Sequence, residues 1–330
     1  MKIAIVKLSA LGDIIHAMVA LQYIKQGRED IQIDWVVEEK FAEVLRYNPH
    51  INRIFTVNLQ AIKKNIFSFF NQYQRIKTIS ENDYDLIIDA QSLIKSAVIS
   101  KLLGNNIAGF DRKSCREGAA ALFYRSKINC SYDVKTIDRN ALILSKPLGF
   151  KITAKQILDK QPFLFYLEED QQIYNYFHQD KKNIIFVISS GWESRNYPKQ
   201  KFLKIAQQLR ENYLVIWGNE QERDAANWLA EHAENITVLP KMDINTLKAA
   251  IAKADLLIGN DTGPTHMAWA LNKPSITIFG PTPVSRVYQT RINKVVKSNS
   301  KVNPHKLNKF DFSIRDIKES DVIELATSLL

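Results

Sequence analysis

The seven residues from Lys7 to Asp13 hold the side chain best placed to act as a base. They read Lys-Leu-Ser-Ala-Leu-Gly-Asp. An apolar run at 3–6 precedes them and a mostly apolar stretch follows, so they join a buried strand to the start of a helix. The helix dipole favours an ionised Asp13, and an ionised carboxylate could take a proton from an attacking hydroxyl. The alternative is that Asp13 only caps the helix, a common use of aspartate.

A second stretch, Asn-Asp-Thr-Gly-Pro-Thr-His at 260–266, also leads from an apolar run into a helix. Thr262 could cap this helix, Pro264 suits its first turn, and Gly263 leaves the backbone amides open. Such a helix start predicts an anion site, especially for a diphosphate. His266 could donate to a phosphate or sugar oxygen. An ordinary strand–helix turn with a packed histidine would give the same pattern.

Three further loops should lie at the same edge, because each follows a predicted strand of the second half. Ser189, Ser190 and Arg195 could hold phosphate, the arginine through its planar fork. In the next loop a carboxylate, of Glu220 or Glu222, could accept hydrogen bonds from a ribose, and in the third Met242 could face an adenine. Each signal is weak alone, since methionine is more often core and glutamate more often solvated.

Basic residues gather in the first half and could hold an anionic acceptor. They are Lys63, Lys64, Arg112, Lys113, Arg116, Arg125 and Lys127. The whole chain has 45 basic and 35 acidic residues, a formal net charge of +10. This excess favours a nucleic acid, an acidic membrane surface or a phosphorylated substrate as partner. A run of charges is also what an ordinary solvated face carries.

The hydrophobic pattern predicts alternating strands and helices as the framework for these motifs. In the first half we expect strands at 2–6, 31–37, 53–57, 86–90 and 107–110, and helices at 13–25, 40–46, 61–78, 93–102 and 136–145. In the second half we expect strands at 183–188, 213–217, 256–258 and 275–279, and helices at 199–209, 221–232, 244–252, from 267, and at 320–330. The alternation predicts an α/β protein with two doubly wound, Rossmann-like parallel-sheet domains that face a central cleft.

The chain of 330 residues is long enough for two cores, and we expect four parts. These are a first Rossmann-like domain at 1–155, a crossing segment at 156–182, a second Rossmann-like domain at 183–315 and a C-terminal helix at 316–330. Packing back on the first domain is one arrangement open to that helix.

Other kinds of site find little support. The sequence has no Walker-type lysine loop, and the first loop has the wrong glycine spacing for the dinucleotide fingerprint. Histidines and cysteines do not cluster, so no metal site is expected. The basic residues form no recognised nucleic-acid module. The sequence opens on a strand pattern without a signal peptide, and no apolar stretch could span a bilayer, so any membrane contact should be peripheral.

Together the motifs resemble those of glycosyltransferase family 9, the bacterial heptosyltransferases of lipopolysaccharide core synthesis. The resemblance rests on Lys-x-Ser-x-x-Gly-Asp at 7–13 and Asp-Thr-Gly-Pro-Thr-His at 261–266, with support at 35–39, 89–96, 122–124, 239–242 and 279–282. It covers nearly the whole chain in the same order and is strongest for the type I enzymes.

The resemblance implies the GT-B fold and an inverting transfer that needs no metal and no cofactor. The donor would be ADP-L-glycero-β-D-manno-heptose, held by the C-terminal domain. The acceptor would be the 3-deoxy-octulosonate (Kdo) sugar on lipid A, held by the N-terminal domain. The enzyme would be cytoplasmic and peripheral on the cytoplasmic face of the inner membrane, with no nucleic acid and no obligate protein partner.

The same resemblance assigns the site residues. Asp13 matches the catalytic base. The donor residues would be Ser189, Ser190, Arg195, Glu222, Met242, Asp261, Thr262, Gly263 and His266. The acceptor residues would be Ser9, Gly12, Lys63, Lys64 and Arg116.

The chain departs from the family pattern at Arg195 and in the loop from Ser190 to Ser194, and the alignment of one further position is ambiguous. Type I enzymes usually carry lysine where this chain has Arg195, which keeps the charge but changes its shape. The ribose carboxylate aligns with either Glu220 or Glu222, and we favour Glu222. The alternative functions are a type II heptosyltransferase or a nucleotide-sugar epimerase of the same architecture. A non-catalytic binder of anionic lipid or nucleic acid, prompted by the net charge, is the alternative of another class.

Overall fold

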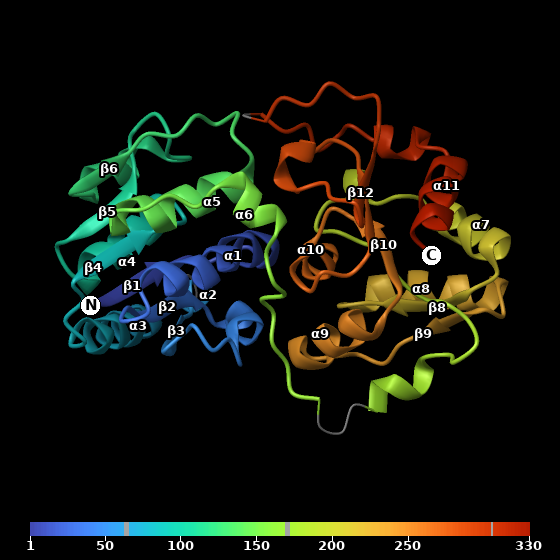
Figure 1. Cartoon of the computed structure of the whole chain (residues 1–330), viewed down its shortest axis with the longest axis horizontal. Helices are drawn as coiled ribbons and strands as arrows, with labels where there is room; N and C mark the ends of the chain where they lie inside the picture. The colour runs from blue at the N-terminus through green and yellow to red at the C-terminus, as the bar shows by residue number, and fades with distance from the viewer. Residues whose placement is uncertain (63–65, 169–171, 305) are drawn as a thin grey trace. The chain divides into compact units, whose positions relative to one another are not determined.

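The computed structural model describes residues 1–62, 66–168, 172–304 and 306–330. They form two compact units, Met1–Phe165 and Tyr166–Leu330 (Figure 1). The border falls inside the expected crossing segment, whose first residues belong to the first unit and whose remainder belongs to the second. Each unit contains its own six-stranded parallel sheet. The prediction of two doubly wound α/β domains is confirmed.

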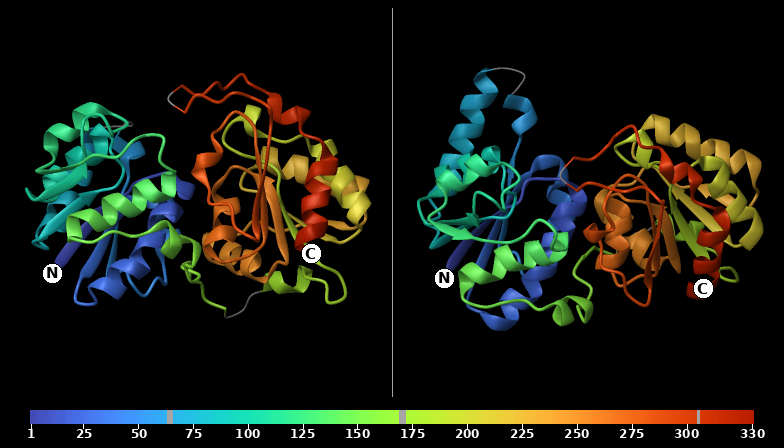
Figure 2. Two further views of the ribbon diagram at one scale, coloured as in Figure 1. Left: turned by 45° about the horizontal axis from the view of Figure 1, so that its top comes forward. Right: turned by 90° about the horizontal axis from the view of Figure 1, so that it is seen from above.

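In the first unit the strand order is β3-β2-β1-β4-β5-β6. The strands are β1 (Lys2–Val6), β2 (Gln32–Glu38), β3 (Arg53–Val57), β4 (Leu86–Asp89), β5 (Ile107–Phe110) and β6 (Ser126–Ile128). The helices are α1 (Leu11–Gly27), α2 (Leu59–Ile62), α3 (Ile66–Ser80), α4 (Ile94–Leu103), α5 (Thr136–Ser145) and α6 (Ala154–Leu158), with short 3₁₀ helices η1 (Glu39–Leu45), η2 (Gly118–Phe123) and η3 (Lys146–Leu148). Helix α1 packs on α5, and α3 packs on α4, so two helical layers cover the sheet (Figure 2).

In the second unit the order is β12-β11-β10-β7-β8-β9. The strands are β7 (Asn183–Val187), β8 (Asn212–Ile216), β9 (Ile236–Val238), β10 (Leu256–Asn260), β11 (Ser275–Phe279) and β12 (Asn293–Lys297). The helices are α7 (Lys199–Leu209), α8 (Glu220–His232), α9 (Ile244–Lys253), α10 (Gly263–Ala270) and α11 (Glu319–Leu329), with 3₁₀ helices η4 (Gln172–Tyr176), η5 (Glu193–Arg195), η6 (Val284–Arg286) and η7 (Ser313–Asp316). If β7 is counted as the first strand of this unit and the sheet is read from β9 to β12, the order is the same as in the first unit.

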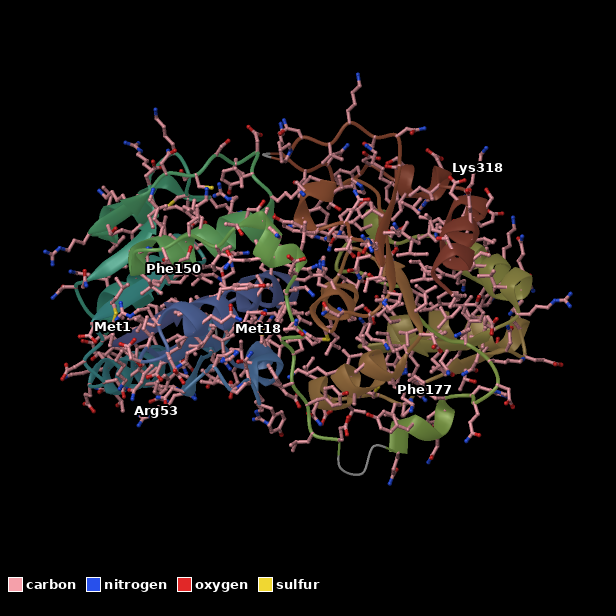
Figure 3. The ribbon with its side chains drawn as sticks, in the orientation of Figure 1. Met1, Met18, Arg53, Phe150, Phe177 and Lys318 are labelled. Carbon is pink, nitrogen blue, oxygen red and sulfur yellow. The ribbon has the colours of Figure 1, made fainter. Side chains whose placement is uncertain are left out.

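The central strands form because they are apolar without interruption and are buried on both faces. Ile3, Ala4, Ile5 and Val6 of β1 have no exposed surface. In β10, a Cβ added to Gly259 would lie 2.4 Å from the Cβ of Val187, so the close approach of β10 to β7 needs a glycine there. Met18 of α1 is buried, whereas Arg53 at the start of β3 and Lys318 before α11 are exposed (Figure 3).

Three strands were not predicted, namely β6, β9 and β12. Each lies at the edge of its sheet and is only partly buried. β6 and β9 have three residues each, and β12 begins with Asn293 and Lys294, so none has a long apolar run. The helix expected at 40–46 is a 3₁₀ helix, η1. The helix expected at 61–78 corresponds to α2 and α3, with residues 63–65 outside the described residues.

The C-terminal helix α11 packs inside the second unit. It contacts α7, β11 and β12, and Val322, Ile323 and Ala326 join the core of that unit. This burial differs from the arrangement in which the helix packs on the first domain. An amphipathic helix covers the nearest exposed apolar face, and here that face belongs to the sheet that directly precedes it.

Candidate active site

Each sheet reverses its strand order between two central neighbours, and a ligand usually binds beside such a reversal. In the first unit the neighbours are β1 and β4, and in the second unit they are β7 and β10. The loops after these four strands carry Asp13, Gln91, Arg195 and Asp261. The sequence-predicted motifs therefore lie at two reversal points, one in each unit.

The loop after β1 is fixed by the loop after β4. The backbone amides of Leu8 and Ser9 both donate to Oε1 of Gln91 at 3.1 Å. Helix α1 begins at Leu11, which places Gly12 and Asp13 in its first turn, both partly exposed. Ser9, Gly12 and Asp13 thus lie together at the carboxyl edge of the first sheet.

Asp13 makes only a weak cap. Its Oδ2 is 3.5 Å from the backbone nitrogen of Ala10, at the long limit of a hydrogen bond. The helix has no other side-chain cap from its N-cap residue. A carboxylate in the first turn that is partly exposed and makes one long hydrogen bond can accept a proton. The geometry is therefore compatible with both roles considered for Asp13, that of a general base and that of a helix cap.

A buried lysine lies beneath this loop. Nζ of Lys7 donates to the carbonyl of Ala90 at 2.7 Å and to Oδ1 of Asn140 at 3.1 Å. Burial lowers the pKa of Lys7, while the negative charges of Asp13 and Asp89 act in the opposite direction. Lys7 therefore joins the exits of β1 and β4 and adds a cationic group near Asp13.

Asp89, the last residue of β4, organises the neighbouring loop. One oxygen accepts from the amides of Gln91 and Ser92 at 2.9 and 3.0 Å, and the other from the hydroxyls of Ser96 and Tyr124 at 2.9 and 2.7 Å. Burial raises the pKa of Asp89, and these four hydrogen bonds oppose the rise. The stretches at 89–96 and 122–124 thus meet around one carboxylate and position Gln91.

Of the basic residues expected to hold an acceptor, Arg116 lies beside this edge. Its neighbour Glu117 donates its amide to the carbonyl of Ser92 at 3.4 Å and accepts from the amide of Ile94 at 2.7 Å. The exposed Arg116 is therefore next to the loop after β4. Lys63 and Lys64 lie outside the described residues.

In the second unit, Asp261 is surrounded by cations and is almost completely buried. Its Oδ2 accepts from Thr282 Oγ1 at 3.0 Å and faces Nη1 of Arg286 at 3.3 Å and of Arg195 at 3.5 Å. Its Oδ1 is 3.2 Å from Nε2 of His266. Burial alone would raise the pKa of Asp261, but the hydrogen bond from His266 and the charges of Arg286, His266 and Arg195 hold it far below its usual range. Asp261 is thus an ionised anchor for three basic side chains.

The sequence did not single out Arg286 or Thr282 as site residues. Both follow β11, the neighbour of β10, and Arg286 ends η6. The signal that could have found them is their position after a predicted strand of the same sheet, because parallel strands bring such loops to one edge. Arg286 adds a second guanidinium to the charge predicted from Arg195.

Arg195 is held in a short loop after β7. Its guanidinium lies 4.7 Å from the ring of Trp192. The loop closes on itself because the amide and hydroxyl of Ser190 both contact Oδ1 of Asn196, at 2.7 and 3.0 Å. Ser189 and Ser190 are partly exposed beside it. The hydroxyl of Ser190 is therefore engaged within the loop.

Helix α10 begins as predicted, with one difference. Thr262 is the N-cap, Gly263 the first helical residue and Pro264 in the first turn, but the hydroxyl of Thr262 makes no capping hydrogen bond. The prediction that this side chain caps the helix is wrong. The first amides of α10 are therefore not occupied by the Thr262 hydroxyl, and they can meet an anion at the positive end of the helix.

Glu222 and Met242 lie on the remaining two loops. The carboxylate of Glu222 accepts from the amide of Gly218 at 2.7 Å and from Nδ2 of Asn219 at 2.9 Å, which fixes the start of α8. Glu220 instead pairs with Arg223 at 3.3 Å. Met242 is partly buried after β9. In the part of the chain that the structure describes, no three histidine, cysteine, aspartate or glutamate side chains are grouped to hold a metal ion.

Comparisons with known proteins agree on one family. A family model described as glycosyltransferase family 9 (heptosyltransferase) matches residues 73–312. The curated relative lipopolysaccharide heptosyltransferase 1 of Campylobacter coli is 37% identical over all of this chain and 99% of its own. Its Escherichia coli K12 counterpart is 30% identical over 86% of this chain and 88% of its own. A solved Escherichia coli heptosyltransferase with ADP-2-deoxy-2-fluoro heptose covers all of both chains with a TM-score of 0.80 at 24% identity, which shows a shared GT-B fold.

Proposed function

This chain belongs to glycosyltransferase family 9, and from that premise we propose that it moves a heptose from ADP-heptose to the Kdo sugar of Kdo-lipid A. It is a heptosyltransferase of lipopolysaccharide inner-core synthesis, an enzyme of the type I group. The observation that carries the finer proposal is the cluster of Arg195, Arg286 and His266 around Asp261 at the start of α10, since this cluster fits a diphosphate leaving group.

On the donor side, the second unit would hold the nucleotide. Arg195, Arg286 and the first amides of α10 would meet the diphosphate, where negative charge grows as the bond to the sugar breaks. Two guanidinium groups and a helix start supply positive charge of the kind that a metal ion supplies elsewhere, so we propose a transfer without a metal. Glu222 would face the ribose, Met242 the adenine, and His266 the sugar or phosphate.

On the acceptor side, Asp13 would be the general base. Its carboxylate takes the proton from the acceptor hydroxyl as that oxygen attacks the anomeric carbon. The bond from this carbon to the diphosphate oxygen breaks at the same time, and its electron pair leaves with ADP. Attack from the face opposite the leaving group inverts the anomeric configuration.

The first unit would position the acceptor through Ser9, Gly12 and the basic residues Lys63, Lys64 and Arg116. We place the protein in the cytoplasm, peripheral on the inner membrane, because its acceptor is a lipid. No described helix is long and apolar enough to cross a membrane. The cleft between the two domains stays a prediction.

The direct test is to incubate the purified protein with ADP-heptose and Kdo-lipid A and to identify the product by mass spectrometry. We expect one added heptose, no addition to lipid A that lacks Kdo, and an inverted anomeric signal by NMR. Activity should survive EDTA. Consumption of ADP-heptose without an acceptor would point to an epimerase and reject the proposal.

Asp13→Asn is the matched variant for this assay, because it keeps the size of the side chain and removes the base. We expect transfer to fall by about 10² to 10⁴, the usual contribution of a general base, with ADP affinity by calorimetry unchanged. Full activity in Asp13→Asn would remove this residue from the role of base.

A further inference from the structure

Exposed apolar side chains gather on three neighbouring elements of the first unit. They are Phe69 and Phe70 of α3, Ile94, Val98 and Leu102 of α4, and Leu122 of η2. Helix α4 packs against both α3 and η2, so these side chains belong to one continuous region, which we name the α3–α4 face. Leu122 is 82% exposed and Phe70 57%. Contact of such apolar side chains with water is unfavourable, and a cluster of them marks a surface that another molecule covers.

Helix α4 is apolar on two sides. Ala97, Ile99 and Leu103 are buried within the unit. Ile94, Val98 and Leu102 recur every four residues, so they form a stripe along the opposite, exposed side. A soluble helix needs one apolar side to join its own core, and a second apolar side indicates a second apolar partner.

The charges of the α3–α4 face indicate what kind of partner this is. The segments Ile66–Ser80, Ile94–Leu103 and Gly118–Phe123 contain no aspartate or glutamate. They contain four basic residues, which are Arg75, Lys77, Lys95 and Lys101, all exposed. The carboxylate of Glu117, on the amide of Ile94, lies at one end of the stripe. Apolar side chains with an excess of cations complement the interface of an anionic bilayer, where aliphatic groups enter the acyl boundary and cations meet phosphate headgroups.

The α3–α4 face begins beside the acceptor loop. Ile94, the first residue of the stripe, donates its amide to Glu117, and the loop before it contains Gln91, which holds Ser9. The face therefore starts at the sheet edge that carries Asp13 and extends along the surface of the same unit. A lipid-linked sugar bound near Asp13 would need its acyl chains to remain in a membrane close to this edge.

We propose that the α3–α4 face docks this protein on an anionic bilayer and so sets the height of the site above the membrane. The proposal rests on the proposed function, because a lipid-linked acceptor is what makes such docking useful. Phe70, Val98, Leu102 and Leu122 enter the interface, while Lys95 and Lys101 contact anionic headgroups.

The test is cosedimentation of the full chain with vesicles of phosphatidylcholine alone or with phosphatidylglycerol. We expect the wild-type protein to bind the anionic vesicles at least tenfold more tightly, and added salt to weaken that binding, because each cation near the surface adds about 1 kcal/mol. The double variant Val98→Glu/Leu102→Glu should lower binding to anionic vesicles at least tenfold. Lys95→Ala/Lys101→Ala removes two exposed cations without touching the core and should lower binding about thirtyfold by the same arithmetic.

Leu158→Glu is the matched control, because Leu158 of α6 is an exposed leucine of the same unit outside the α3–α4 face. It should bind vesicles like the wild-type protein. Wild-type binding by both double variants would overturn the proposal. A change in oligomeric state by light scattering, without a change in vesicle binding, would also overturn it and would assign the face to a second copy of this chain.

Transfer assays separate this proposal from the proposed function. With an acceptor that carries the Kdo sugar but no acyl chains, the double variants should keep wild-type turnover, and with vesicle-embedded acceptor they should lose at least tenfold. If the wild-type protein transfers to neither acceptor, the proposed function fails, while the vesicle measurement still decides the docking surface.

Discussion

Asp261 is a buried carboxylate whose negative charge holds basic side chains of the same unit in place. Its 2% exposure would disfavour ionisation, yet Arg195, Arg286, His266 and Thr282 all point at its two oxygens. A charge in such a place is stable only while its partners remain, and the partners are held in position only while the charge remains. The arrangement of Arg195, Arg286 and His266 therefore depends on one side chain.

The variant Asp261→Asn should destabilise the second unit by about 3 kcal/mol at neutral pH, because it leaves buried cations without their anion. The folded-state pKa of Asp261 is depressed, so its contribution is complete well above the ordinary carboxyl value of 3.8 and is lost as the pH falls through the folded-state value. Urea unfolding at several pH values should show a constant gap between wild type and variant above about pH 5 that shrinks below pH 4. A gap that stays the same down to pH 3 would contradict this account.

Arg195 stands where the resemblance to the type I enzymes implies a lysine. Arg195→Ala should lower kcat/KM for the donor about a hundredfold, as expected when one stabilising group is removed from a leaving group. Arg195→Lys should recover part of this loss, because it restores the charge but cannot span both Asp261 and a phosphate. Steady-state kinetics with varied ADP-heptose measures both effects, with the exposed Arg291→Ala as control. Wild-type kinetics in Arg195→Ala would place the donor elsewhere.

At the scale of elements, Arg139 of α5 organises the basic segment between β5 and α5. Its Nη1 donates to the carbonyls of Cys130 and Ser131 at 2.8 and 2.6 Å, and its Nη2 to that of Ser114 at 2.7 Å. The guanidinium also lies 4.5 Å from the ring of Tyr132. One side chain thus fixes both ends of the segment that presents Arg116.

Arg139→Ala should loosen residues 111–131 and raise the KM for the acceptor severalfold, with ADP affinity unchanged, because the donor residues lie in the other unit. Hydrogen exchange of the amides in this segment should be about tenfold faster, the effect of losing about 1.4 kcal/mol of local stability. Arg139→Lys should not restore protection, since one ammonium cannot reproduce the planar fork. Arg125→Ala, which removes an exposed arginine of the same segment, is the control, and equal exchange in both alanine variants would refute the role of Arg139.

The strands and loops also differ in how well they can be predicted from the sequence. The runs that became β1, β7 and β10 were predictable because a strand buried on both faces must be apolar throughout. The edge strands β6, β9 and β12 were not, because a half-covered edge tolerates Lys127 or Lys294. The loops that carry Asp13 and Asp261 could be placed for a related reason, since a parallel sheet gathers its strand exits. The same rule could have placed Arg286 and Thr282 at this edge, but their contacts with Asp261 depend on side-chain geometry that no sequence pattern gives.

At the scale of the molecule, the chain repeats one architecture twice. Each unit has its own sheet with the same strand order and its own core, and the border at Phe165 and Tyr166 falls between elements. The residues of this second core that the structure describes lie on elements from β7 through α11. The second unit should therefore be able to fold by itself.

A fragment Tyr166–Leu330 should fold and bind ADP within about threefold of the whole chain, a difference below 1 kcal/mol. A fragment that ends at Asp316 should not melt cooperatively. It lacks the buried Val322, Ile323 and Ala326 of α11, and each large apolar side chain lost from a core removes about 1.5–3 kcal/mol from a total of about 5–15. Differential scanning calorimetry and ADP titration test both fragments. A cooperative transition in the shorter fragment would show that α11 is dispensable.

The carboxylate of Asp261 also has a consequence for how a catalytic cycle ends. Arg195 and Arg286 have a counter-ion that belongs to the protein itself. A diphosphate bound there would share the two guanidinium groups with Asp261, and after it leaves they would again pair with Asp261 alone. If the diphosphate binds as proposed, spent nucleotide would leave by an exchange between two anions, and the two guanidinium groups would keep a counter-ion in a poorly hydrated place. Because Asp261 competes for the same two arginines, the affinity for ADP would be limited, which favours fast release of ADP and binding of the next donor.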